Sequence, residues 1–247
     1  MVEPISGKEA KDYVLNHHYS KSFSSATKRY GLYRTVPGER RLCGVAVYGT
    51  SVGQHVFRLA LPELEPIVEA LELSRFVLDD SCPGNSESWF IARCHEYLYR
   101  DAIRGVISFA DPVPRRDLAG KVIFPGHVGT IYKSTNAIYT GRATPRTVKL
   151  LPDGTVLNDR AAQKVRRQEQ GHDYVEEMLV RMGARVPAAG VKPAEWLWTA
   201  LQDVGARNLR HRGAHRYVFP LGRTRKERAS IKIGPEPERY PRQPDRG

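Results

Sequence analysis

Hydrophobic and polar positions alternate in blocks along the first half of the chain, and these blocks predict an α+β fold. Residues 8–16 have the spacing of a short amphipathic helix. Two runs of strand character follow at 30–34 and 41–49, and the turn residues Pro37 and Gly38 lie between them. This arrangement predicts a β-hairpin.

The next block predicts a strand, a helix and a second strand. Residues 71–78 alternate apolar and polar positions, and 86–101 carry apolar residues at the spacing of a buried helical face. The apolar run 105–110 then ends at Asp111, which precedes a proline. A strand, helix and strand within this length predict a parallel pair joined by a right-handed crossover.

The second half of the chain predicts further elements and a change of pattern. In order, we expect a short helix at 126–133, a strand at 138–141, a basic helix capped by Asp159, helices at 173–182 and 194–204, and a strand at 215–221. Strands on both sides of 142–212 favour a helical insertion in one sheet over a separate domain. We therefore expect one domain over 1–222 and a basic, proline-rich tail over 223–247.

The net charge of the chain indicates the kind of partner that it binds. Thirty-nine Lys and Arg against 27 Asp and Glu leave a net charge of +12, and such a balance favours polyanions such as DNA, RNA or a membrane surface. Between Arg207 and Lys232 the excess is concentrated, although a solvated basic tail would have the same composition. The candidate phosphate contacts are Lys164, Arg166, Arg167, Arg210, Arg212, Arg216, Arg223, Arg225, Lys226 and Arg228.

Other features point to a reducing compartment. The three cysteines are scattered and fit neither a disulfide framework nor a zinc ribbon. No apolar run approaches the roughly 20 residues that cross a bilayer, and the N-terminus has no signal-peptide pattern. We expect a cytoplasmic protein without a membrane partner, and the sequence leaves its oligomeric state open.

Two places offer groups for acid–base chemistry or metal binding. Asp111 ends a predicted buried strand, where open α/β sheets place their ligand sites, and it is a candidate base or metal ligand. Alternatively it caps a turn. The run that contains His18, Tyr19 and Ser20 offers an imidazole, a phenol and a hydroxyl side by side. Surface histidines beside a capping serine are the simpler interpretation.

Two further places are weaker candidates. Glu72 and Arg75 lie on the predicted strand 71–78, and strand alternation points them to opposite faces. They form either a structural ion pair or a clamp for a substrate. Gly126 and Gly129 precede Tyr132 in a predicted helix start, where backbone N–H groups could approach an anion, although such glycines are common in turns.

Taken in order, the blocks HHYS, VAVYG, ELSR, SFADP, GHVGTIYKSTNAIYTG and HRYVFPL resemble the Mom proteins of phages and prophages. The resemblance runs from about residue 10 to 222 and is least over 142–212. It implies a fold similar to GNAT-type N-acetyltransferases, which is a mixed, splayed β-sheet flanked by helices. It also implies an enzyme that modifies adenine in double-stranded DNA at the exocyclic amine with a carbamoylmethyl-type group, protecting phage DNA from restriction in the bacterial host cell.

The resemblance also assigns residues. The catalytic set that it implies is His18, Tyr19, Ser20, Glu72, Arg75, Ser108, Asp111, His127 and Tyr132. Members of the family are thought to hold iron, and His18, Tyr19 and Asp111 match the expected ligand positions, an oxygen-rich set that could also hold other ions. Tyr19 and Tyr132 would also stack on an extruded base.

One segment departs from the acyl-CoA-using relatives. They carry a glycine-rich loop after the first splayed strand, whereas residues 79–86 here contain two acids and a proline. Acids repel a pyrophosphate and proline removes a donor. An acetyl-CoA site is therefore not expected, and the donor of the transferred group stays open.

Two alternatives from other classes remain. The first is an acyl-CoA-dependent N-acyltransferase that acts on a protein or small molecule. The second is a non-catalytic DNA-binding phage protein, which would bind DNA without changing its nucleosides.

Overall fold

The computed structural model describes residues 1–18, 20, 22–36, 38–50 and 53–242. The chain divides into two compact units. The first comprises Met1–Asp111, His127–Ala143 and Ala214–Gln243, and the second contains Pro112–Gly126 and Thr144–Gly213.

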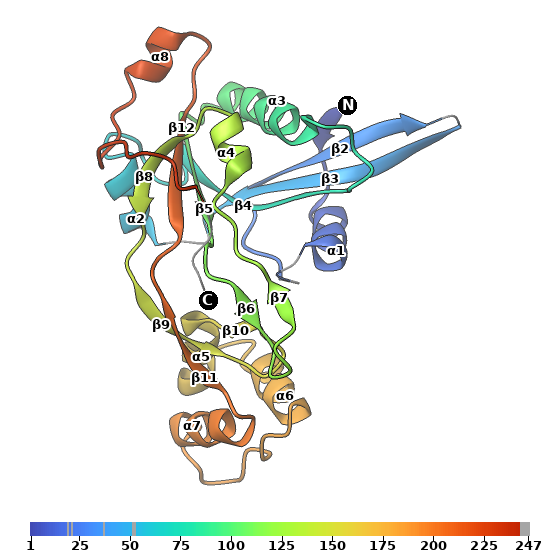
Figure 1. Ribbon diagram of the computed structural model, residues 1–247, viewed down its shortest axis with the longest axis vertical. Coiled ribbons are helices and arrows are strands. Elements are labelled where there is room, and N and C mark those ends of the chain that lie inside the picture. Colours follow the sequence, from blue (N-terminus) through green and yellow to red (C-terminus); the bar gives the residue numbers. More distant parts are fainter. Residues whose placement is uncertain (19, 21, 37, 51–52, 243–247) are drawn as a thin grey trace. The chain divides into compact units, whose positions relative to one another are not determined.

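A mixed β-sheet forms the centre of the first unit (Figure 1). Its seven described strands lie in the order β1 (Val2–Pro4), β2 (Lys28–Val36), β3 (Glu39–Gly49), β4 (Ala70–Leu78), β5 (Gly105–Ala110), β12 (His215–Pro220) and β8 (Ile138–Arg142). The pair β4 and β5 is parallel, while the other neighbouring pairs are antiparallel. The predicted mixed, splayed sheet flanked by helices is confirmed, and so is the hairpin, which β2 and β3 form.

The sheet opens between its two parallel strands. β4 pairs with β5 only over Ala70–Leu73, opposite Gly105–Ser108. Beyond this point β4 continues beside β3, and β5 continues beside β12. Helix α3 (Ser86–Arg100) connects β4 to β5, which confirms the predicted strand–helix–strand unit. The opening leaves strand ends without a partner on one side, a common place for ligand sites in α/β proteins.

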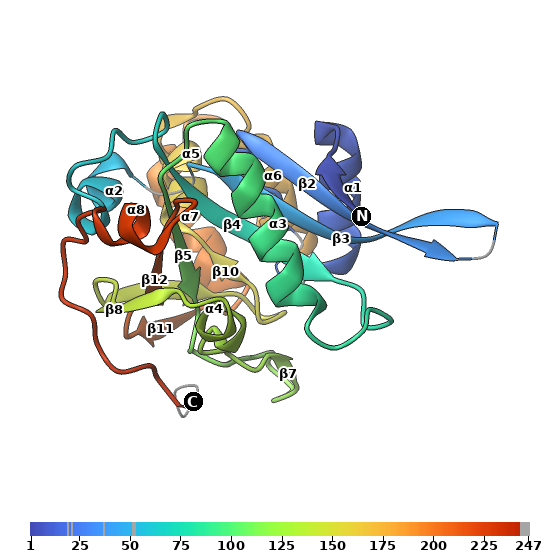
Figure 2. The ribbon, with the colours of Figure 1, turned by 90° about the horizontal axis from the view of Figure 1, so that it is seen from above.

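Helices cover both faces of the sheet (Figures 1 and 2). On one face, α3 packs its apolar side on β3, β4, β5 and β12, next to the short α4 (Thr130–Ser134). On the other face, α1 (Gly7–His17) packs on β3, and α2 (Gln54–Ala60) packs on β4, β5 and β12. These are called the α3 face and the α1 face below. None of the described helices is long and apolar enough to cross a membrane.

A β-bulge in β4 places Arg75 on the opposite face of the sheet from the one that the sequence predicted. The register between β3 and β4 shifts between Leu73 and Arg75, so Ser74 is an extra residue in β4. Before the bulge, Leu73 points to the α3 face, and Glu72 therefore points to the α1 face. After it, Val77 packs on the α1 face. Arg75 thus points to the same face as Glu72, and the prediction of opposite faces is wrong because an inserted residue reverses the alternation.

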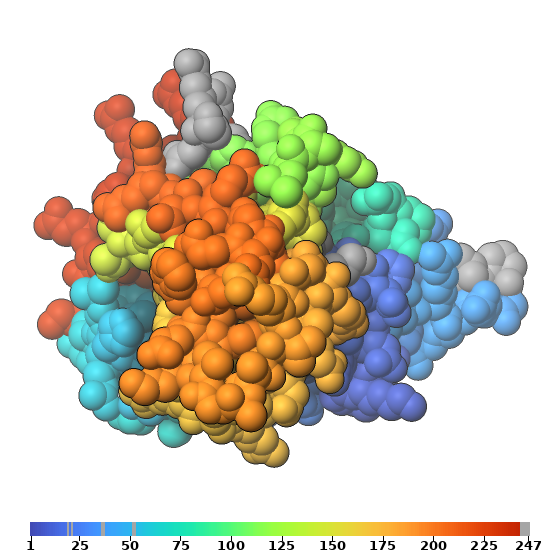
Figure 3. Space-filling view, turned by 90° about the horizontal axis from the view of Figure 1, so that it is seen from below, coloured from blue at the N-terminus to red at the C-terminus, as the bar shows by residue number. Residues whose placement is uncertain are grey.

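The second unit has its own sheet and core. A three-stranded sheet, which the sequence did not predict, joins β10 (Val156–Leu157), β9 (Arg146–Leu150) and β11 (Arg207–His211). Its helices, whose surface Figure 3 shows in yellow and orange, are α5 (Asp159–Arg167), α6 (Asp173–Arg181) and α7 (Pro193–Asp203). They bury a separate apolar cluster. A short ribbon of β6 (Arg115–Arg116) and β7 (Val122–Phe124) belongs to this unit.

Two predicted helix starts are corrected. The side chain of Asn158, not of Asp159, caps α5 by accepting a hydrogen bond from the amide of Ala161 (2.8 Å). Helix α4 begins at Thr130 and not at residue 126, because Gly126 and Gly129 have φ angles of 76° and 71°. Such angles interrupt a right-handed helix and are readily adopted by glycine.

The basic segment that begins at Arg207 is not one tail. Its first part forms β11 in the second unit, and its next part forms β12 in the first unit. The chain then forms the short helix α8 (Arg225–Ala229). After α8, Tyr240 packs beside Tyr139 and Tyr217, with ring centroids 6.5 Å away in each case. The basic residues after Arg207 are neighbours in the sequence, but the strand pairings distribute them over the two units.

We predict that Gly49→Ala destabilises the protein by about 2 kcal/mol, since overpacking typically costs 1–3 kcal/mol. A Cβ at Gly49 would fall against the backbone carbonyl of Ser25, where the segment leading into β2 crosses the end of β3. Urea unfolding measures the change. Gly84→Ala is the matched control, because a Cβ there meets no atom within 4 Å, and equal stability of the two variants would contradict the crowding at Gly49.

Candidate functional site

Three chain segments meet on the α1 face near the opening between β4 and β5. His18 follows α1, Arg75 lies on β4 just beyond the bulge, and His127 lies in the segment that returns to β5. Electrostatic interactions with Arg75 and His127 both affect the pKa of His18. The fold therefore brings together three residues of the predicted set from distant parts of the sequence.

His18 is a buried, neutral imidazole. Its residue is 7 % exposed, and burial, followed by the nearby Arg75 and His127, lowers the pKa of His18 to about 4. The backbone N–H of Ser20 donates to its Nδ1 (3.1 Å), and the Ser20 hydroxyl lies 2.8 Å from the same nitrogen. Since a backbone N–H can only donate, Nδ1 is the acceptor and the ring proton is on Nε2.

Arg75 fastens the serine-rich segment after α1 to the sheet. Its Nε donates to the carbonyl oxygen of Ser22 (2.8 Å), and a terminal nitrogen donates to the Ser22 hydroxyl (2.9 Å). A second contact joins the hydroxyls of Ser24 and Ser74 (2.6 Å). Ser74 in turn donates to the carbonyl of Val47 (3.2 Å), so the bulge residue links the segment to β3.

Asp111 and Glu72 add carboxylates at the same opening. Asp111 directly follows β5 and is partly exposed. Its carbonyl oxygen accepts the backbone N–H of His127 (2.7 Å), which holds His127 beside the end of β5. Glu72 is buried on the α1 face of β4. His18, Arg75 and His127 are thus brought together on the α1 face, and the carboxylate-bearing residues Glu72 and Asp111 lie on β4 and directly after β5, the two strands that border the opening. Imidazole and carboxylate groups are suited to proton transfer, and a guanidinium is suited to anion binding.

Two residues of the predicted set lie in the core of the α3 face. Ser108 is fully buried, and its hydroxyl donates to the carbonyl of Leu73 (3.1 Å) at the last paired position of β4 and β5. Tyr132 is 5 % exposed, and its ring packs against Tyr217 and Phe219 at centroid distances of 5.1 and 5.9 Å. Tyr132 is therefore almost fully buried, and its stacking on an extruded base stays a prediction.

Two of the three predicted iron ligands, His18 and Asp111, lie within the described residues. Tyr19 lies outside them. The His18 ring carries its proton on Nε2 and uses Nδ1 as an acceptor, so it does not fit a metal ligand in this arrangement. No group of three or more His, Cys, Asp or Glu in the described part of the chain could hold a metal ion. Iron stays a prediction from the resemblance.

The predicted phosphate contacts differ in accessibility. Arg216 is 6 % exposed, and its guanidinium donates to the side chain (2.9 Å) and carbonyl (2.7 Å) of Thr140. The prediction that it contacts phosphate is wrong, because its guanidinium is buried and is bound to Thr140 of β8. Lys164 is partly buried, and its ammonium lies 5.8 Å from the ring of Tyr174. The exposed members are Arg166, Arg167, Arg210 and Arg212 in the second unit, and Arg223, Arg225, Lys226 and Arg228 in the first.

Sequence reasoning missed the serines that organise the site. Ser22, Ser24 and Ser74 make its hydrogen bonds, but serine runs occur in many loops and no spacing distinguishes these. A signal was present in the serine-rich stretch directly after His18. This serine-rich stretch matters because the bulge in β4 directs Arg75 toward it. The pattern of apolar and polar residues in the strand does not reveal a bulge.

Comparisons with known proteins identify a family and give alignments with solved structures. The Mom protein family matches residues 1–242. A search of curated proteins found no match. A tandem GNAT protein from the clavulanic acid biosynthesis pathway aligns at 9 % identity and a TM-score of 0.46, covering 91 % of this chain and 99 % of that one. An N-acetyltransferase from Staphylococcus aureus Mu50 aligns at 11 % identity and a TM-score of 0.35, covering 61 % and 87 %.

We predict that Arg75→Gln loosens the segment Ser22–Ala26, because it removes the guanidinium that holds Ser22. Hydrogen exchange of the Thr27 amide, which directly follows this segment and donates to the carbonyl of Tyr48 (2.8 Å), should become at least about tenfold faster, as expected when a charge-assisted hydrogen bond that holds the segment is lost. Arg75→Lys should give an intermediate effect, since an ammonium cannot reproduce the fork. Arg58→Gln, at an exposed position on α2, is the control, and unchanged exchange in Arg75→Gln would contradict the role of this contact.

Proposed function

The chain belongs to the Mom protein family, and from this premise we propose that it modifies adenine in double-stranded DNA at the exocyclic amine. Membership supports a transferase in phage DNA modification. The identity of the base and a carbamoylmethyl-type product belong to the proposal. The observation that carries it is the convergence of His18, Arg75 and His127 with the end of β5, where Asp111 lies.

The target atom determines how the enzyme must act. The adenine amine is inaccessible inside a stacked duplex, so the base has to be extruded at a cost of about a few kcal/mol. The amine is a weak nucleophile because its lone pair is delocalised into the purine. It therefore needs a nearby base and an activated donor.

The site residues divide this work. We assign Asp111 as the base, because it is partly exposed at the opening of the sheet and its carboxylate can accept a proton. The amine nitrogen bonds to the electrophilic carbon of the donor, the bond from that carbon to its leaving group breaks, and the proton from nitrogen passes to Asp111. His18 contributes its Nε2–H as a hydrogen-bond donor, since its Nδ1 is occupied by Ser20. Arg75 holds the serine segment and supplies positive charge for an anionic part of the donor.

The loop after β4 supports a donor other than acetyl-CoA. The amide of Ser81 donates to the Asp79 side chain (2.8 Å), and the amide of Cys82 donates to the Asp79 carbonyl (3.0 Å). The amide of Ser86 donates to the carbonyl of Pro83 (3.2 Å). Amides that would otherwise cradle a pyrophosphate are therefore satisfied within the loop, which argues against the acyl-CoA-dependent alternative.

The exposed cations of the second unit are the proposed contacts to the DNA backbone. Arg166 and Arg167 lie at the end of α5, and Arg210 and Arg212 lie on and after β11. Guanidinium groups suit phosphate because their parallel N–H donors match its oxygens. Such contacts position the duplex without selecting a sequence.

We predict that Asp111→Asn and His18→Gln each reduce DNA modification at least about a hundredfold, the range typical for loss of a proton-transfer group at Asp111 and of a positioned hydrogen-bond donor at His18. The readout is nucleoside mass spectrometry of DNA from cells that express each variant in place of the wild type, so that the cell supplies the donor and no wild-type enzyme is present. Both variants should keep the unfolding midpoint and the DNA affinity. Asp12→Asn, at an exposed position on α1, is the control. Full activity of Asp111→Asn would refute the assignment, and unchanged nucleosides with the wild type would favour a non-catalytic DNA-binding protein.

We also predict that DNA binding weakens steeply with salt and that the double variant Arg166→Gln, Arg167→Gln reduces this dependence. Each lost phosphate contact makes the slope of log K against log salt shallower by about 0.9, so the pair should change it by about 2. Fluorescence anisotropy with a labelled duplex measures both slopes. Lys192→Gln is the control, because Lys192 is exposed beside Glu195 in the same unit. A slope unaffected by the double variant would exclude α5 as a backbone contact.

A further inference from the structure

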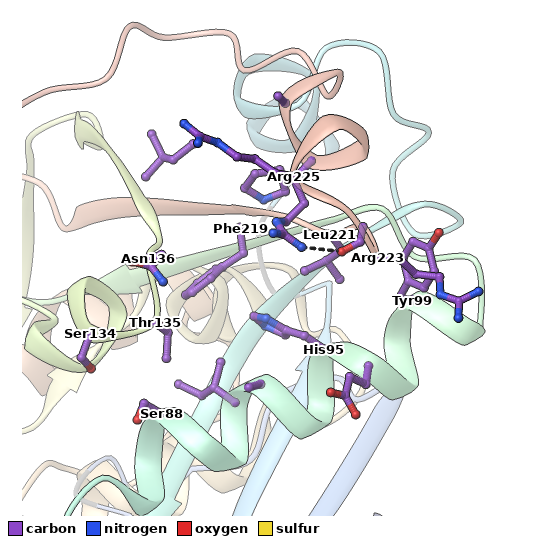
Figure 4. Close-up of a pocket in the computed structure, with 18 of the residues that line it drawn as sticks. Ser88, His95, Tyr99, Ser134, Thr135, Asn136, Phe219, Leu221, Arg223 and Arg225 are labelled. Carbon is purple, nitrogen blue, oxygen red and sulfur yellow. Dashed lines mark hydrogen bonds between the residues drawn. The ribbon is translucent and has the colours of Figure 1, made fainter.

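A large cavity lies on the α3 face of the first unit (Figure 4). Its volume is about 1370 Å³, and its walls come from α3, the residues that follow α4, the end of β12, and α8. The candidate site residues Glu72 and Arg75 point to the α1 face, so the cavity is a separate feature of the fold. The proposed DNA modification does not use it.

Arginines dominate the charge of the cavity. Arg100, Arg223, Arg225 and Arg228 line it and are exposed. Arg228 donates to the carbonyl of Gly222 (2.7 Å), whereas the guanidinium groups of the other three make no hydrogen bond or ion pair with the described residues. Glu96 of α3 also lines the wall, and its carboxylate is paired with Arg93 of the same helix (2.8 Å). The cavity therefore has a surplus of positive charge that suits an anion.

A hydrogen bond between α3 and α8 holds these arginines in place. The hydroxyl of Tyr99, on α3, donates to Glu227 of α8 (2.9 Å). The same carboxylate accepts the amide of Arg223 (2.8 Å), and the side chain of Thr224 caps the helix. The start of α8 is thus fixed against α3, and the positions of its arginines follow from this contact.

The cavity also has an apolar floor with one polar atom in it. Ile91, Phe219 and Leu221 line it. His95 rises from α3 toward Phe219, with the ring centroids 4.9 Å apart (Figure 4). Its Nε2 is buried and has no hydrogen-bond partner among the described residues. Burial lowers the pKa of His95 to about 3, so the ring is neutral. A buried polar atom without a partner costs free energy that a bound polar group would restore.

We propose that this cavity binds a phosphorylated nucleotide. Arg100, Arg223 and Arg225 would bind the phosphates, and the base would lie on the apolar floor with a hydrogen bond to His95. The volume exceeds the 300–1,000 Å³ typical of small-molecule sites, so a nucleotide fits. A DNA backbone needs an accessible row of cations, not a hollow with an apolar floor and a buried imidazole. Two of the arginines predicted from the sequence to contact DNA, Arg223 and Arg225, are therefore assigned to this cavity.

Isothermal titration of the full-length protein with ATP, ADP and AMP tests the proposal. At least one nucleotide should bind with one-to-one stoichiometry. Arg100→Gln and Arg225→Gln should each weaken its binding about tenfold, the loss expected for one charge-assisted contact to phosphate. Arg58→Gln, at an exposed position of the same unit outside the cavity, should bind as the wild type does. Thermal unfolding checks that each variant is folded.

Two further measurements distinguish recognition of the base from recognition of the phosphates, and a free nucleotide from DNA. His95→Asn should weaken nucleotide binding while leaving the binding of inorganic triphosphate unchanged, because His95 faces the base. A short DNA duplex should bind Arg100→Gln and Arg225→Gln as tightly as the wild type. The proposal is overturned if no nucleotide binds, if the arginine variants bind nucleotide normally, or if they lose affinity for the duplex alone. The DNA experiments above use His18, Asp111, Arg166 and Arg167, none of which lines the cavity, so either proposal can fail without the other.

Discussion

The hydrogen bonds between β4 and β5 end at Leu73 and Ser108, and the candidate site depends on this limit. If the parallel pairing continued, the ends of both strands would be occupied by each other. Because β4 stays with β3 and β5 stays with β12, an opening forms between them. Ser108 secures the last pair through its hydroxyl bond to Leu73. Ser108 is fully buried because its hydroxyl bonds β4 at the last paired position of the two strands.

The bulge at Ser74 has the second organising role. One extra residue in β4 turns Arg75 to the face that already carries Glu72, and Arg75 then reaches Ser22 in the segment after α1. The same segment passes over Gly49, where a side chain would not fit. His18 is thereby held, buried and neutral, near Arg75 and His127. A local irregularity of one strand thus assembles groups that are more than a hundred residues apart in the sequence.

The two faces of the sheet have different chemistry. The α1 face combines carboxylates, a neutral histidine and a guanidinium at the opening of the sheet, as expected where protons are moved. The α3 face carries a closely packed aromatic core and, beside it, a cavity with exposed arginines. The positive charge of the chain is therefore not one DNA-binding surface. It is distributed over a second unit with exposed arginines, a buried arginine in β12, and the wall of a cavity.

By itself the sequence determined the elements whose periodicity is strong, because burial of one face imposes a period of 2 on strands and 3.6 on helices. The hairpin, the unit of β4, α3 and β5, and the ordered motifs of the family all follow from local pattern, and so does the approximate position of Asp111. Only the tertiary structure decided which residues share a face, which of them are buried, and which cations remain exposed. Arg75 and Arg216 were misplaced for this reason, and the burial of Tyr132 could not be foreseen. A bulge, a packed ring and a buried guanidinium depend on partners from distant segments, and no local spacing records them.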